Sequence, residues 1–198
     1  MQQPTDCLLL QFSIDPTDTQ HLAAHAARIC ADRGLQLQRL ACTPDGLAYL
    51  YARLPVRAPL DPQAGSPLAD ALVRSLPSAR GIRVARLQLV YTAPGQAQGV
   101  APLCHYVVET DPEQGWREEL ERWYDAEHMP GLAAVPGCIL ALRYYNHDQG
   151  PFSLACYDLV AEHVLGSPPW LAVRGTPWSD IVRPHFTNTR RTMFRALA

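Results

Sequence analysis

The chain has 198 residues, of which 47% are hydrophobic and 18% charged, and its formal net charge is −2. This composition can bury a core and excludes a disordered protein, and the length suits one large domain or two small ones. The charge gives no basic footprint for nucleic acid. All 17 basic residues other than histidine are arginine, which excludes a Schiff base on a protein lysine.

The first apolar run, Cys7–Leu10, is too short for a signal-peptide core or a membrane span. It follows Met1–Asp6, which carries no positive charge. We therefore expect a cytoplasmic protein with no membrane partner. The six cysteines are widely spaced and include no C-x-x-C pair, which favours buried free thiols over disulfides or a zinc site.

The first half alternates strand-like and helix-like spacing of apolar residues. Asp15–Asp18 is typical of a turn that starts a helix, and Gly34 ends the helical spacing. The predicted elements are a strand at Cys7–Phe12, a helix up to Gly34, strands at Leu35–Cys42 and Leu47–Leu54, a proline-rich loop at Pro55–Pro67, a short helix at Leu68–Leu76 and a strand at Ile82–Tyr91.

The second half repeats this order. Asp111-Pro112 opens a helix whose apolar stripe is Trp116, Leu120 and Trp123. The predicted elements are a strand at Leu103–Glu109, a helix at about Glu113–Glu127, a hairpin of Cys138–Tyr145 and Phe152–Leu159, one or two proline-broken helices in Ala161–Trp178 and a strand at Phe186–Leu197.

Similar openings, Cys7–Pro16 and Cys104–Pro112, about 97 residues apart, indicate a duplication. We predict two ferredoxin-like βαββαβ units, residues 6–93 and 102–198, joined by the linker Ala93–Pro102. Each such unit leaves one sheet face uncovered. The predicted fold is therefore α+β, with the two units forming an internal pseudo-dimeric α+β barrel. A homodimer of whole chains stays open.

The most informative segment is Trp123–Pro130, read WYDAEHMP, followed by Val135-Pro136-Gly137. It resembles the W-Y-D-x-E-H-L-P…P-G signature of EthD-like proteins in the dimeric α+β barrel superfamily, over about Cys104 to Ala198. The resemblance implies the fold and places the site in the second half. It does not select a reaction, because that superfamily contains isomerases, cyclases, lyases, monooxygenases and haem enzymes.

Residues three and four apart share a helix face, so Glu121, Asp125 and His128 are expected to lie close together. With Pro130 following, we expect the helix to end near His128, where the helix dipole and carboxylates favour the charged imidazole. We predict that His128 transfers protons, that Asp125 orients it or shares the proton, and that Tyr124 donates to a substrate oxygen. The structural alternative is that Asp125 or Glu127 pairs with Arg122 or Arg143 while His128 caps helix carbonyls.

Five more residues are candidates for substrate binding. Arg143 could bind a carboxylate, and its alternative is a salt bridge to Asp125 or Glu127. Trp170 and Trp178 could cover an aromatic substrate or fill the core. The predicted substrate-binding residues are His105, Glu127, Arg143, Trp178 and His185. His21 and His25 are one turn apart without a third ligand, so no metal is predicted.

The sequence predicts a cofactor-independent enzyme that binds a small-molecule substrate. There is no phosphate-binding loop, no G-x-S-x-G and no H-E-x-x-H pattern, and no cofactor is predicted. The leading function is acid/base catalysis by a lyase, isomerase or cyclase on a small aromatic or carbonyl-containing substrate, as in aromatic catabolism. The alternatives are a cofactor-free or haem-dependent monooxygenase of the same fold, and a non-catalytic binding or stress-response protein.

Overall fold

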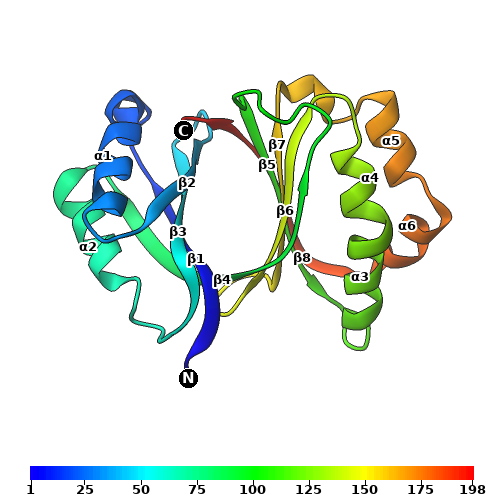
Figure 1. Cartoon of the computed structure of the whole chain (residues 1–198), viewed down its shortest axis with the longest axis horizontal. Coiled ribbons are helices and arrows are strands. Elements are labelled where there is room, and N and C mark those ends of the chain that lie inside the picture. Colours follow the sequence, from blue (N-terminus) through cyan, green and yellow to red (C-terminus); the bar gives the residue numbers. More distant parts are fainter. The chain divides into compact units, whose positions relative to one another are not determined.

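The computed structural model describes residues 1–198, except for the side chain of Gln20. Two units can be distinguished by their internal contacts. Unit 1 comprises Met1–Leu89, Asn146–Gly150 and Phe194–Ala198, and unit 2 comprises Val90–Tyr145 and Pro151–Met193. The fourth and eighth strands, β4 (Arg80–Pro94) and β8 (Phe186–Ala196), each contribute residues to both units (Figure 1).

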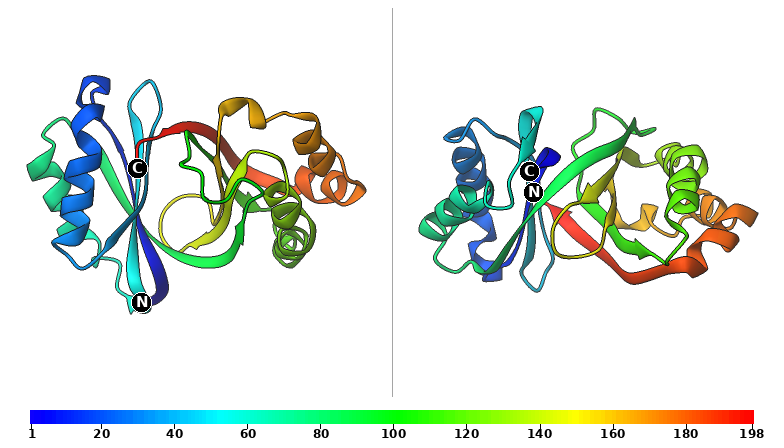
Figure 2. Two further views of the ribbon diagram at one scale, coloured as in Figure 1. Left: turned by 45° about the horizontal axis from the view of Figure 1, so that its top comes forward. Right: turned by 90° about the horizontal axis from the view of Figure 1, so that it is seen from below.

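Unit 1 shows the predicted order of strands and helices. Its sheet has the strand order β4-β1-β3-β2, with antiparallel neighbours, and both of its helices cover one face (Figures 1 and 2). The α1 side chains that recur at helical spacing, Leu22, Ala26 and Ile29, are buried in the core of this unit. Its elements are β1 (Gln3–Ser13), η1 (Pro16–Asp18), α1 (Thr19–Ala31), β2 (Gln36–Cys42), β3 (Leu47–Leu60), α2 (Ser66–Ser75) and β4.

The prediction of a loop at Pro55–Pro67 is wrong for residues 55–60, which belong to a strand. Strand β3 continues to Leu60, and Pro59 is paired with Pro4 of β1. The last residue of β3 that pairs with β2 is Arg53, so this extension has a neighbour on only one side. A proline lacks the N–H of a ladder bond but is tolerated where a strand edge is open.

Unit 2 places several short helices on one face of a second antiparallel sheet, with the strand order β8-β5-β7-β6 (Figures 1 and 2). The proline-rich segment forms short helices as predicted, and Pro168 and Pro177 each stand at a helix start. The elements are β5 (Cys104–Pro112), α3 (Arg117–Trp123), η2 (Tyr124–His128), α4 (Met129–Ala133), β6 (Cys138–Asn146), β7 (Ser153–Leu159), η3 (Glu162–Val164), α5 (Pro168–Arg174), α6 (Pro177–Val182), η4 (Arg183–His185) and β8.

The helix that carries the WYDAEHMP segment does not end at His128, which corrects the prediction. The chain continues through a π-helical turn, η2, into α4, and Met129 donates its N–H to the carbonyl of Tyr124. Pro130 follows this π-helical turn within the continuous helix and donates no backbone hydrogen bond. His128 is therefore not at a helix C-terminus, and the charge effect expected there does not arise.

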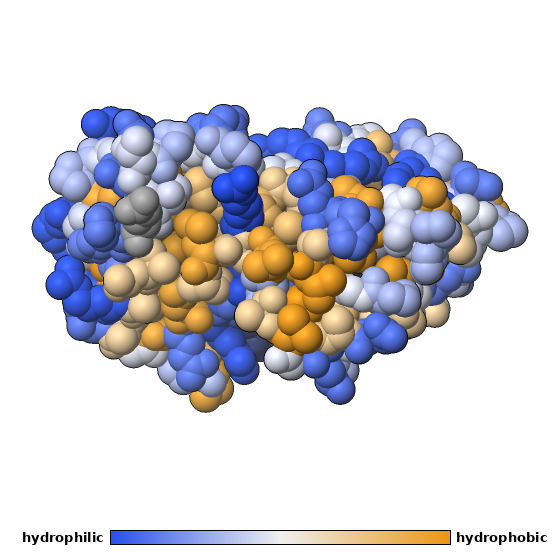
Figure 3. Space-filling view, turned by 90° about the horizontal axis from the view of Figure 1, so that it is seen from above, coloured by the Kyte–Doolittle hydropathy of each residue, from blue (hydrophilic) through white to orange (hydrophobic). Residues whose placement is uncertain are grey.

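Hydrophobic side chains also reach the surface, as the face in Figure 3 shows. The large ones are Met1, Val56, Val73, Val100, Leu103, Leu171 and Ile181. Among the described helices, none is both long and apolar enough to cross a membrane.

Candidate active site

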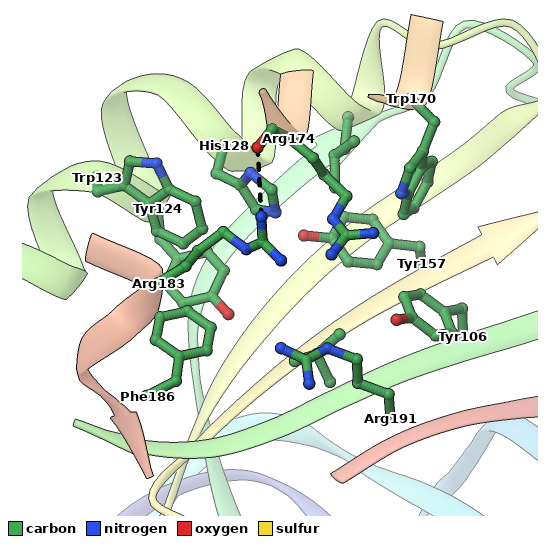
Figure 4. Close-up of a pocket in the computed structure, with 12 residues that line it drawn as sticks. Tyr106, Trp123, Tyr124, His128, Tyr157, Trp170, Arg174, Arg183, Phe186 and Arg191 are labelled. Carbon is green, nitrogen blue, oxygen red and sulfur yellow. Dashed lines mark hydrogen bonds between the residues drawn. The ribbon is translucent and has the colours of Figure 1, made fainter. Parts of the chain in front are cut away.

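A pocket lies within unit 2, between its sheet and its helices (Figure 4). Its recess has an empty volume of about 350 Å³, which includes space open to solvent, but the cavity itself is only about 20 Å³. That is room for about one ordered water molecule. The lining residues are Tyr106, Val108, Trp123, Tyr124, His128, Leu132, Tyr157, Trp170, Arg174, Arg183, Phe186 and Arg191.

His128 is a buried, neutral base at this pocket. Only 8% of the residue is exposed, and its ring is stacked on Trp123 with 4.1 Å between ring centroids. The Nδ1 atom is buried without a hydrogen-bond partner among the described residues. Burial, and then the charges of Arg183 and Arg174, lower the pKa of His128 to about 3. The imidazole is therefore uncharged near neutral pH, and the same causes oppose its protonation while the pocket is empty.

The buried imidazole should also make the protein sensitive to acid. The pKa of His128 is lower in the folded protein than its ordinary value of 6.5, so its contribution to stability is present above pH 6.5 and is lost as pH falls towards 3. We expect wild type to lose up to about 1.4 kcal/mol more unfolding free energy per pH unit below 6.5 than His128→Gln. Urea unfolding of both proteins at pH 7, 6 and 5 measures this difference, and parallel curves would contradict it.

Three arginines from three different elements meet at the pocket. Arg174 ends α5, Arg183 begins η4 and Arg191 belongs to β8; Figure 4 shows Arg174 and Arg183 beside His128 and Arg191 on the strand side. Within the described part of the chain, none of them is in an ion pair, and no acidic residue lines the pocket. Burial and the charges of Arg174 and Arg191 lower the pKa of Arg183. The arginines thus repel one another and together favour an anion.

Buried aromatic side chains form the remaining walls. Burial raises the pKa of Tyr124 and of Tyr106, so both phenols are neutral and can donate a hydrogen bond. Tyr157 donates its hydroxyl to Met129 Sδ at 3.1 Å. The indole nitrogens of Trp123 and Trp170 are buried without a partner in the described structure. The phenols of Tyr106 and Tyr124 are thus the donors that these walls offer to a ligand.

Asp125 does not contact His128, because the π-helical turn changes the spacing on which that expectation rested. Its carboxylate accepts a hydrogen bond from Arg143 Nη2 at 2.8 Å and is half-exposed. Asp125 and Arg143 thus form the salt bridge that the sequence offered as the alternative to catalytic and substrate-binding roles. Glu121 instead accepts from Arg117 at 2.9 Å. His128 and Tyr124 are thus the two predicted catalytic residues that line the pocket.

The five predicted substrate-binding residues are absent from the lining of this pocket, and the structure gives each a partner elsewhere. His105 is buried and bound through Nδ1 to Asp158 Oδ1 at 2.8 Å, and its neighbour in β5, Tyr106, faces the pocket instead. Glu127 accepts from Thr176 Oγ1 at 2.5 Å. Arg143 binds Asp125, Trp178 donates to Glu119 at 2.7 Å, and His185 binds Glu113 and stacks on Trp116.

The three arginines were not among the residues predicted from the sequence. Simple alternation along β8 would put Arg190 on the same face as Phe186, and Arg191 on the other. Instead Asn188 has a positive φ of 49°, Arg190 pairs with Glu109, and Arg191 lines the pocket together with Phe186. An asparagine inside a strand is a weak signal for such an irregularity.

Sequence searches find no relatives: no protein-family model matches the chain and no curated protein does. Solved structures do match. A proposed monooxygenase from Lactobacillus acidophilus is 13% identical, with 99% of this chain and 95% of that one covered and a TM-score of 0.67. An anthrone oxidase-like protein is 16% identical, with 98% of this chain and 92% of that one covered and a TM-score of 0.56. A chlorite dismutase variant from Candidatus Nitrospira defluvii is 7% identical, with 98% of this chain and 92% of that one covered and a TM-score of 0.59.

The chain therefore shares the fold of these proteins. At these identities the likeness shows the fold and not a reaction. The narrower resemblance of Trp123–Pro130 to EthD-like proteins stays a prediction, since no family model matches.

Haem, which one predicted alternative requires, does not fit this pocket. Haem needs a broad apolar slot and an axial ligand. Here the cavity is about 20 Å³ and three arginines line it, while His128 is stacked flat on Trp123. Among the described residues there is also no group of three or more His, Cys, Asp or Glu side chains that could hold a metal ion.

Proposed function

We propose that unit 2 is a cofactor-independent monooxygenase for a small planar aromatic substrate with an acidic C–H or O–H bond. The observation that carries this proposal is the neutral, buried His128 beside arginines that have no acidic partner. A neutral imidazole can remove a proton, and the arginines stabilise the anion that this step creates.

Deprotonation is the step that the residues of this chain perform. His128 takes the proton from the substrate, and the charge left behind is spread over the aromatic system. Arg174 and Arg183 lie beside His128, so they stabilise the negative charge where it forms (Figure 4). Tyr124, which is buried and neutral, donates to a substrate oxygen.

An electron-rich carbanion can then react with dioxygen without a cofactor. For a ring CH₂ group, the carbanion forms a C–O bond with O₂, the peroxide takes up the proton from His128, and loss of water leaves a ketone. One CH₂ and one O₂ give one C=O and one H₂O. All four electrons given up by the carbon are accepted by dioxygen, so no further reductant is required.

The fold neighbours support this version over the lyase, isomerase or cyclase that the sequence favoured. They include a proposed monooxygenase and an anthrone oxidase-like protein, and an anthrone has a doubly activated ring CH₂ group. No residue in the pocket selects a lyase, isomerase or cyclase reaction, so that function stays a prediction. The same holds for a non-catalytic binding protein.

The test is oxygen consumption with anthrone by protein that native mass spectrometry shows to be free of haem, flavin and metal. We expect one O₂ per substrate and one ¹⁸O atom from ¹⁸O₂ in the product. Turnover of a substrate at the same rate without oxygen would contradict the monooxygenase and favour an isomerase or lyase. A bound ligand that is never converted would favour the binding protein.

We also propose that the chain arose by tandem duplication, with residues 6–93 as a structural repeat and 102–198 as the repeat that carries the site. The same βαββαβ order in both units supports this proposal. A possible homodimer and a cytoplasmic location stay predictions, and the native mass spectrum measures the first of them.

A further inference from the structure

We infer that the substrate binds as a planar aromatic carboxylate, with its carboxylate among Arg174, Arg183 and Arg191. This inference rests on the proposed function, because it names the substrate class of the same site. Three features of the pocket carry it: uncompensated positive charge, unpartnered buried donors and aromatic walls.

The positive charge has no partner in the protein. Other arginines of unit 2 do have one, since Arg143 pairs with Asp125 and Arg190 pairs with Glu109. The charge of Asp180 raises the pKa of Arg183, but Asp180 is exposed on α6 and forms no ion pair with Arg183. Guanidinium groups of like charge repel one another, and a carboxylate that binds them offsets this repulsion.

The buried nitrogen atoms point to the same kind of ligand. His128 Nδ1, Trp123 Nε1 and Trp170 Nε1 have no hydrogen-bond partner among the described residues, and their residues are at most 8% exposed. Buried polar atoms normally have a partner, so each open one calls for an explanation. Figure 4 shows the indole nitrogen of Trp123 turned away from the arginines and that of Trp170 on the side of Arg174, so Trp170 is the indole that can donate to an oxygen atom of an acid.

The walls set the shape of the ligand. Six of the lining residues are Tyr, Trp or Phe, and they favour a flat aromatic ring. The cavity of about 20 Å³ cannot hold such a ring as it stands. Arg191 is exposed and its long side chain can rotate. Entry of the ligand therefore requires the arginines to move.

An anionic substrate would also activate the base. After burial, the causes that hold the pKa of His128 low are the charges of Arg183 and Arg174. A carboxylate bound to these arginines offsets their charge, so the pKa of His128 rises towards the range in which imidazole is an effective base. Recognition of the acid and readiness for proton transfer are thereby coupled.

The experiment measures binding without turnover, under nitrogen, by titrating the full-length protein with benzoate and 1-naphthoate. The matched neutral ligands are benzamide and 1-naphthamide. Tryptophan fluorescence reports binding because Trp123 and Trp170 line the pocket. We expect the acids to bind at least about 10-fold more tightly than the amides, and the NMR titration of His128 to show a raised pKa with acid bound.

Two neighbouring arginines provide the variant and its control. Arg191→Gln should weaken acid binding roughly 10-fold to 100-fold. Arg190→Gln removes the ion pair with Glu109, which lies outside the pocket, and should leave the affinity for acids unchanged. Equal affinity for acids and amides, or an equal effect of both variants, would overturn the inference. The proposed function would fail separately, through a lack of oxygen consumption, since binding under nitrogen requires no turnover.

Discussion

His128→Gln is expected to lower turnover by about 10²-fold to 10⁴-fold, the range that a positioned general base contributes. Glutamine keeps a polar side chain of similar size in the buried position but cannot accept a proton at neutral pH. Steady-state oxygen consumption at saturating substrate measures the loss. Acid binding should persist, because the three arginines are unchanged, so the loss should be in kcat more than in KM.

Two further proteins make this result interpretable. His163→Gln replaces an exposed histidine of the same unit and should retain full activity. His128→Ala leaves a space beside Trp123 that imidazole from solution can fill, so added imidazole should restore part of the activity. Near-wild-type turnover in His128→Gln would remove His128 from the mechanism. His128 would have a structural role if His128→Ala were inactive, were not rescued by imidazole and had an altered near-ultraviolet circular dichroism spectrum.

Asp125→Asn is expected to destabilise the protein more than removal of its partner does. The Arg143 side chain is completely buried, and its Nε and Nη1 atoms have no hydrogen-bond partner among the described residues. Removing one partner of a fully buried ion pair costs about 3–5 kcal/mol. Because the Asp125 side chain is 50% exposed, we expect about 2 kcal/mol of lost unfolding free energy.

Arg143→Met removes the buried charge itself, so we expect a change of no more than about 1 kcal/mol. The double variant Asp125→Asn/Arg143→Met should recover most of the stability lost in Asp125→Asn, because no unpaired charge remains buried. Glu121→Gln, at the more exposed pair with Arg117, is the control and should cost less than about 1 kcal/mol. Urea unfolding measures all four variants, and a double variant no more stable than Asp125→Asn would contradict this account.

The parts of the fold that could be predicted are those set by local periodicity. Alternation and helical spacing of apolar residues gave the order of the strands and helices in both units, whereas the choice of His128 and Tyr124 rested on the resemblance of Trp123–Pro130 to EthD-like proteins. Strand β3 was underestimated because prolines were taken to end it, whereas the tolerance for Pro59 depends on where its neighbour β2 ends.

The parts of the site that could not be predicted depend on geometry that local spacing does not contain. Arg174, Arg183 and Arg191 lie in three elements far from the WYDAEHMP segment in sequence, and only tertiary packing brings them to His128. The orientation of Arg191 depends on the irregularity at Asn188. The separation of Asp125 from His128 depends on one backbone hydrogen bond, from Met129 to Tyr124.

That hydrogen bond has a consequence for comparing this chain with others. A π-helical turn contains one residue more than the α-helical turn it replaces, and one residue corresponds to a rotation of about 100° around the helix axis. In a relative whose helix is α-helical throughout, the residue aligned with His128 by sequence alone would face a different direction. The structurally equivalent position is found only when a one-residue gap is opened between Tyr124 and His128. Alignments that keep this segment ungapped would therefore compare side chains on different faces of the helix.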